Sequence, residues 1–143
     1  MRRPLLIPFI AMLLAADAKD GSVEKEKTAL CGTWQLQYWI DPAGEKIGVA
    51  DGFIMFTDDR ITVTQGRQTA SMDYTIKATK DPKEVDVTVV DGDSKGKIGR
   101  LIYKIEDDVF TLCGGIAARE RPKEFKTSKE LGHAIHVFKR VNN

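Results

Sequence analysis

From residue 33 onward, apolar and polar residues alternate over short runs, and residues typical of turns separate the runs. A period of two places successive side chains on opposite faces, so the pattern predicts β-strands with one buried face. Turn signals such as Asp41-Pro42-Ala43-Gly44 end the runs. The predicted strands are 33–40, 52–56, 60–64, 69–78, 85–89, 97–105, 109–113 and 133–141.

Nearly all connections between these strands are short, and only the segment 114–132 is long. Short connections make consecutive strands antiparallel neighbours. About eight such strands in simple order favour closure, because the first and last strands then meet. We therefore expect an all-β fold, an up-and-down barrel of lipocalin-like form, with an open β-sandwich as the alternative.

The N-terminal residues predict an exported protein. Met1-Arg2-Arg3-Pro4 is basic, Leu5 to Ala16 is apolar, and Ala16-Asp17-Ala18 has the small-x-small pattern of a cleavage site. A membrane-spanning helix needs about 20 apolar residues, more than this run contains. We expect a signal peptide over 1–18, cleavage after Ala18, no membrane span in the mature form, and a periplasmic or extracellular location.

The segment after the expected cleavage site predicts a short helix. Ser22 to Leu30 is rich in helix formers and begins with a residue suited to N-capping. We expect a helical lead-in over 19–31, followed by a single barrel domain over 32–143. Such a helix is long enough for one or two turns, so it can cover or introduce the barrel.

Charge and motifs argue against nucleic-acid binding and catalysis. The 22 basic and 21 acidic residues are interspersed, whereas nucleic-acid binding calls for a clustered basic face. His133 and His136 are expected on opposite faces of one strand, so they cannot hold a metal together. Asp58-Asp59 and Asp107-Asp108 lie in predicted hairpin turns, where Asp bonds local backbone. We expect no enzyme activity, cofactor, metal or nucleic-acid partner.

Two cysteines in an exported chain raise the question of a disulfide. Cys31 precedes the first predicted strand and Cys113 ends the seventh, which runs in the same direction. The two thiols should therefore lie near opposite ends of the barrel. Even a five-residue strand spans about 17 Å, whereas a disulfide tolerates a Cα separation of under about 7 Å. We expect two free thiols if the strand order is correct.

Gly32-Thr33-Trp34 and the distant pair Lys139-Arg140 resemble the closed end of lipocalin and fatty-acid-binding barrels. In those families a basic side chain crosses the closed end and lies over the indole. A guanidinium on a tryptophan face is worth about 0.5–2 kcal/mol. The resemblance implies that Gly32, Trp34 and Arg140 close one end of this barrel, with Gly32 allowing a close backbone approach.

A second resemblance covers almost the whole mature chain. The chain is similar to a small domain family of unknown function, best known from planctomycete bacteria and often found behind signal peptides. Leu101 replaces a glycine usual in that family, and Gly114-Gly115-Ile116-Ala117 replaces a proline-containing link. The resemblance implies a fold and export, but no known activity. It rests on Gly32-Thr33-Trp34, Asp81-Pro82, Asp86-x-Thr88, Gly96-Lys97, Ile102-Tyr103, Leu112-Cys113, Arg121-Pro122-x-x-Phe125 and Lys139-Arg140.

Two hypotheses of function follow from a small exported barrel. The first is a binding module whose interior takes a small apolar molecule, with lining residues Tyr38, Met72, Tyr74 and Tyr103. Side chains can also fill an eight-stranded barrel completely, so ordinary core is the favoured interpretation of each of these four residues. An apolar interior space of several hundred Å³ would favour a ligand.

The second hypothesis is a protein-interaction or inhibitor-like domain that uses the outer sheet face against an extracytoplasmic partner. Trp39 alternates with Trp34 along the first strand and is the expected exposed anchor. Arg121, Pro122 and Phe125 lie in the long connection, which either forms a flap or docking edge or is fixed to the barrel. In the latter case Phe125 packs on the barrel side, and Arg121 binds nearby carbonyls or carboxylates.

Overall fold

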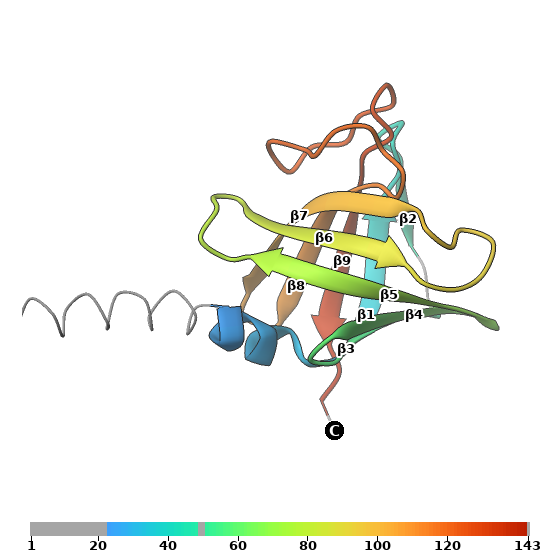
Figure 1. Cartoon of the computed structure of the whole chain (residues 1–143). Helices are drawn as coiled ribbons and strands as arrows, with labels where there is room; N and C mark the ends of the chain where they lie inside the picture. The colour runs from blue at the N-terminus through green and yellow to red at the C-terminus, as the bar shows by residue number, and fades with distance from the viewer. Residues whose placement is uncertain (1–22, 49–50, 143) are drawn as a thin grey trace, which may run out of the picture.

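A computed structural model describes residues 23–48 and 51–142 of the 143-residue chain. The expected signal peptide, 1–18, lies outside these residues. The strands are β1 (Gly32–Ile40), β2 (Lys46–Gly48), β3 (Gly52–Phe56), β4 (Arg60–Gln65), β5 (Gln68–Lys77), β6 (Lys83–Val89), β7 (Ile98–Glu106), β8 (Val109–Gly114) and β9 (Ala134–Arg140). All described strands form one antiparallel sheet in the order β2-β1-β3-β4-β5-β6-β7-β8-β9, and pairing of β1 with β9 closes it into a barrel (Figure 1).

The closed eight-stranded meander is confirmed, and the open sandwich is not formed. The bounds of β3 are as predicted, and those of the other predicted strands differ by one or two residues at one or both ends. One additional strand, β2, was not predicted. It pairs only with β1 and lies outside the closed ring. With three residues, β2 is too short to show an alternation in the sequence.

A β-bulge in β1 changes which side chains face the interior. The register between β1 and β9 shifts between Leu36 and Tyr38, which leaves Gln37 as the additional residue. Before the bulge the predicted alternation holds, because Trp34 and Leu36 are both buried in the core. After it every side chain changes face, as a one-residue shift in a strand requires.

The bulge contradicts two predictions. Tyr38 is paired with Val137 on the outside of the barrel, where Lys46 Nζ lies 4.1 Å from the centre of its ring. Tyr38 was therefore wrongly predicted to line the interior. Trp39 is paired instead with His136, and their rings stack at 5.3 Å with an interplanar angle of 10°. Trp39 is half-buried and faces inward, so its prediction as an exposed outer anchor was also wrong.

The N-terminal helix, residues 23–30, covers one end of the barrel. Leu30 is only 1% exposed and joins the core, and Trp34 Nε1 donates a 2.9 Å hydrogen bond to the Leu30 carbonyl. The Arg140 guanidinium lies 4.1 Å from the centre of the Trp34 ring. Its Nη2 and Nη1 donate to the Ala29 and Cys31 carbonyls at 2.6 and 3.2 Å. The predicted pairing of Trp34 with Arg140 is thus confirmed, and it also anchors the helix.

Gly32 is required at this end for a different reason from the predicted one. A Cβ at position 32 would meet Arg140 Nη1 at 3.6 Å, an ordinary contact, so space is not the constraint. The Gly32 φ of +117° is the constraint, since side-chain-bearing residues rarely adopt it.

Aromatic rings fill the half of the interior nearest the helix. Phe110 lies at their centre, with ring-centre distances of 5.5 Å to Trp34, 5.5 Å to Phe56, 6.0 Å to Tyr103 and 5.6 Å to Phe138. Phe110 and Tyr103 are each 1% exposed. This half of the barrel is therefore packed core, and any interior space must lie toward the other end.

The contacts of Arg140 predict its contribution to stability. Arg140→Met loses the cation–π contact, worth about 0.5–2 kcal/mol, and two hydrogen bonds from a charged donor, each worth about 1.5–3 kcal/mol. We expect the free energy of unfolding, measured by urea denaturation, to fall by at least about 3 kcal/mol. Lys139→Met, at the exposed neighbouring position, is the control and should change it little. A loss of under about 0.5 kcal/mol in Arg140→Met would contradict this role.

Candidate functional site

The half of the barrel interior away from the helix contains a cavity of about 220 Å³. Inward-facing side chains of β3 to β9 form its wall, and nearly all of these side chains are apolar. His136 contributes the only polar side chain among the described residues that line it. The lining includes Ile54, Val63, Met72, Val87, Leu101, Leu112, Ile116 and Phe138.

A glycine on β7 leaves room for the segment after β8 to pack at the edge of this space. Gly99 faces inward on β7, where a Cβ would lie 2.8 Å from Ile116 Cδ1 and 2.9 Å from Val87 Cγ2. Ile116 occupies that position from the segment after β8, and a backbone bridge joins it to Gly99. The Ala117 N–H also donates a 2.9 Å hydrogen bond to the Ile98 carbonyl. Gly114-Gly115-Ile116-Ala117, the departure from the planctomycete-type pattern, therefore forms part of the rim of the cavity.

Two further hollows adjoin the cavity at the same end. One, of about 210 Å³, shares Val63, His136 and Phe138 with it and reaches Trp39. The other, of about 550 Å³, shares Val63, Met72 and Ile116 and extends between the β4–β5 and β6–β7 turns. In Figure 1 these turns lie at the opposite end of the barrel from the helix. The cavity thus has a mouth at one end and the aromatic core at the other.

His136 lies where the cavity and the hollow beside Trp39 meet. Its ring stacks on Trp39 and lies 6.3 Å from the centre of Phe138, with an interplanar angle of 19°. Burial lowers the pKa of His136 below its usual 6.5, so the imidazole is neutral at pH 7. A neutral imidazole has one donor and one acceptor nitrogen. Neither nitrogen makes a hydrogen bond to another described residue.

The predicted lining residues are distributed differently from expectation. Met72 lines the cavity. Tyr74 and Tyr103 face the interior but belong to the packed half, where their hydroxyls donate to Thr57 O at 2.6 Å and Glu26 Oε1 at 3.0 Å. Burial is the main cause that raises the pKa of Tyr74 to about 12. Burial also raises the pKa of Tyr103, and the neighbouring Glu26 raises it further.

His136 was considered in the sequence only as a metal ligand and was missed as a site residue. Its spacing of two from Phe138 on the last strand places both side chains on the interior face. That spacing was the available signal. The position of Trp39 beside it depends on the bulge and had no signal in the sequence.

The long connection between β8 and β9 lies against the outer wall of the barrel. Arg121 forms ion pairs with Asp86 and, at 3.4 Å, with Glu84, and it donates to the Leu101 carbonyl at 2.9 Å. The Lys104 ammonium lies 4.9 Å from the centre of the Phe125 ring. These contacts fix the connection to the side of β6 and β7. This agrees with the second of the two alternatives given for the connection, in which it is fixed to the barrel. The interpretation of Arg121, Pro122 and Phe125 as a flap over the mouth is corrected accordingly.

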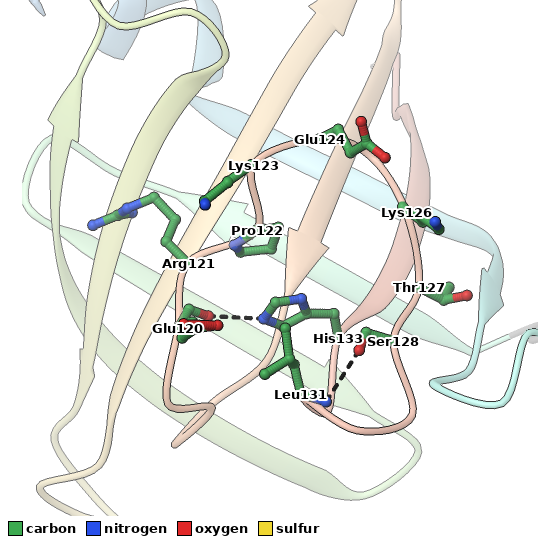
Figure 2. A pocket seen from close by; sticks show the side chains of 10 residues that line it. All are labelled: Glu120, Arg121, Pro122, Lys123, Glu124, Lys126, Thr127, Ser128, Leu131 and His133. Carbon is green, nitrogen blue, oxygen red and sulfur yellow. Dashed lines mark hydrogen bonds between the residues drawn. The ribbon is translucent and has the colours of Figure 1, made fainter.

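This connection encloses a hollow of its own, of about 440 Å³ (Figure 2). His133, only 3% exposed, is bonded to the Glu120 carbonyl at 2.7 Å, and Ser128 Oγ accepts a bond from the Leu131 N–H at 3.0 Å. Figure 2 shows Arg121 pointing away from the hollow. Its remaining charged lining, Glu120, Lys123, Glu124 and Lys126, has both signs and favours no ligand charge. The barrel cavity is therefore the stronger candidate.

Comparisons with known proteins identify no relative. Neither the family models, nor the curated proteins, nor the solved structures give a match. Membership in the planctomycete-type family stays a prediction. Across residues 23–48 and 51–142, no helix has the length and apolar character needed to cross a membrane. The same residues contain no group of three or more His, Cys, Asp and Glu that could hold a metal ion.

The lowered pKa of His136 predicts a dependence of stability on pH. Below about pH 6.5 the unfolded chain binds a proton at this histidine before the folded chain does, so the contribution to stability is lost as pH falls. The free energy of unfolding should drop more steeply from about pH 7 to about pH 5 in the native chain than in His136→Phe. A pKa of 6.5 or above, measured by NMR titration of the His136 ring, would contradict the expectation.

The long connection predicts the reactivity of the two cysteines, both of which are free thiols. Cys113 is fully buried beneath it, with Sγ 3.5 Å from the Lys126 carbonyl, and burial raises its pKa. A buried, protonated thiol reacts slowly. In Cys31→Ser the remaining thiol should react with a thiol reagent only after denaturation. Absence of free thiols in the denatured native chain would show that a disulfide forms.

Proposed function

We propose that this protein is an exported, non-catalytic binding module that takes a small apolar molecule into the open half of its barrel. The observation that carries the proposal is the apolar cavity of about 220 Å³ between the mouth and the aromatic core. Antiparallel strands form its wall, so the site is preformed and needs little ordering when a ligand enters.

The size of the cavity indicates the size of the ligand. An engineered apolar protein cavity of about 150 Å³ is large enough for benzene. The cavity of 220 Å³ adjoins a second hollow of 210 Å³, with which it shares lining residues, and the two together suit a molecule with one to three rings or a short acyl chain. Burial of about 300 Å² of apolar ligand surface, at about 25 cal/mol per Å², corresponds to a micromolar Kd at best.

A second candidate function rests on the outer face of β3. Phe53 and Met55 are 37% and 45% exposed and lie two residues apart on that face. Their neighbours in the paired strands include Gln35, Thr62 and Thr64, which carry no charge. An exposed apolar pair in an uncharged setting favours contact with an extracytoplasmic protein. The pair now takes the place of Trp39 in this hypothesis.

The binding proposal is tested with N-phenyl-1-naphthylamine, a neutral probe whose fluorescence rises in apolar surroundings. The native chain should show a saturable rise with one site. Val63→Phe narrows the cavity and should weaken binding at least tenfold, which is about 1.4 kcal/mol. Val109→Phe, the same change at an exposed position outside the barrel, is the matched control and should bind as the native chain does.

Both variants should first be shown to fold by circular dichroism. If folded Val63→Phe binds the probe with native affinity, the probe binds outside the barrel interior. A native chain that gives no saturable signal would contradict the binding function itself and leave the outer face of β3 as the candidate.

A further inference from the structure

His136 differs from the other polar groups of the interior. Trp34 Nε1 and the hydroxyls of Tyr74 and Tyr103 each donate a hydrogen bond within the protein. The imidazole of His136 contacts rings instead, and no hydrogen bond joins it to any other residue of the described ranges. His136 is only partly buried, so its nitrogens are open to a bond from water or from a ligand.

The nitrogens of His136 can be reached from the cavity. No completely buried side-chain nitrogen or oxygen in the described part of the chain lacks a partner, so the imidazole nitrogens retain access to open space. His136 lines both the cavity and the hollow beside Trp39. Stacking on Trp39 at an interplanar angle of 10° fixes the plane of the ring and hence the directions in which its nitrogens can bond.

The charges around the mouth restrict the ligand further. No Lys or Arg lines the cavity or either adjoining hollow among the described residues, whereas Asp91 and Asp93 line the hollow at the β6–β7 turn. Arg140 contacts the core at the closed end, where it is engaged with Trp34 and with the Ala29 and Cys31 carbonyls. An anionic ligand would lose its hydration without gaining a cation as a partner.

We infer that the ligand is a neutral molecule with one hydroxyl or carbonyl group, which His136 binds while the apolar body of the molecule fills the cavity. This assignment rests on the proposed binding function and names the class of ligand. The neutral imidazole offers a donor and an acceptor, so it can serve either group. Fatty acids and other carboxylates are excluded by the same arrangement.

The experiment measures displacement of N-phenyl-1-naphthylamine from the full mature chain by naphthalene, 1-naphthol and 1-naphthoate. These three ligands share one ring system and differ in the polar group. The native chain should bind 1-naphthol about tenfold more tightly than naphthalene, as one hydrogen bond of about 1.4 kcal/mol predicts. It should bind 1-naphthoate more weakly than naphthalene.

His136→Phe keeps a planar ring for the stack with Trp39 but removes both nitrogens. It should abolish the preference for 1-naphthol, so the ratio of the two Kd values measured in this variant, naphthalene to 1-naphthol, should fall from about tenfold to about one. If this variant does not fold, ¹⁵N NMR of the native chain replaces it, and the imidazole nitrogens of His136 should shift with 1-naphthol and not with naphthalene.

Failure of the inference and failure of the proposed function give different results. Equal binding of naphthalene and 1-naphthol, or a preference for 1-naphthol that survives in His136→Phe, would overturn the role of His136 but leave an apolar binding site. Tighter binding of 1-naphthoate than of naphthalene would overturn the exclusion of anions. If the probe itself does not bind, the result contradicts the proposed binding function, and the assignment of the ligand class is then wrong as well.

Discussion

The pairing of β1 with β9 is the constraint on which the rest of the structure depends. It turns a meander of antiparallel strands into a closed barrel and removes the sheet edges that an open meander would expose. This pairing also contains the bulge at Gln37. Because β1 is held by β3 and β9 is held by β8, the extra residue of β1 is accommodated as a bulge between them. Without the bulge, Tyr38 would face the interior and Trp39 the solvent, and His136 would lose its stacking partner.

The barrel divides into a half that provides stability and a half that provides space. Near the helix, the side chains of Leu30, Trp34 and Phe110 are at most 1% exposed, and Arg140 joins the last strand to the Ala29 and Cys31 carbonyls. Toward the mouth most inward positions hold aliphatic residues or Gly99, and the rings of Trp39 and His136 stack on each other between β1 and β9. A cavity lowers stability because its lining loses packing contacts, so an interior that is tightly packed at one end can tolerate it at the other. This division is what makes a ligand site in so small a domain physically reasonable.

The long connection shows how a segment without strands can still be fixed in place. Arg121 binds the carboxylates of Asp86 and Glu84 and a strand carbonyl, and Cys113 is buried underneath. The connection therefore adds a small second core on the outside of β7 and β8, while its first residues reach inward to place Ile116 at the rim. Its first residues and its middle part thus act on opposite faces of the same sheet.

The sequence by itself determined the strand order, the closed barrel, the short helix and the pairing of Trp34 with Arg140, because alternation, turn residues and short connections are local signals that do not depend on the rest of the chain. It also placed Met72 in the interior. Only the tertiary structure decided the face of Tyr38 and Trp39, the cavity and the site at His136. A bulge is set by how two distant strands meet, and a cavity is the volume left after side chains from many strands have packed. Neither is encoded in a local pattern, since the run Tyr38-Trp39-Ile40 is bulky and apolar and fits either register equally well.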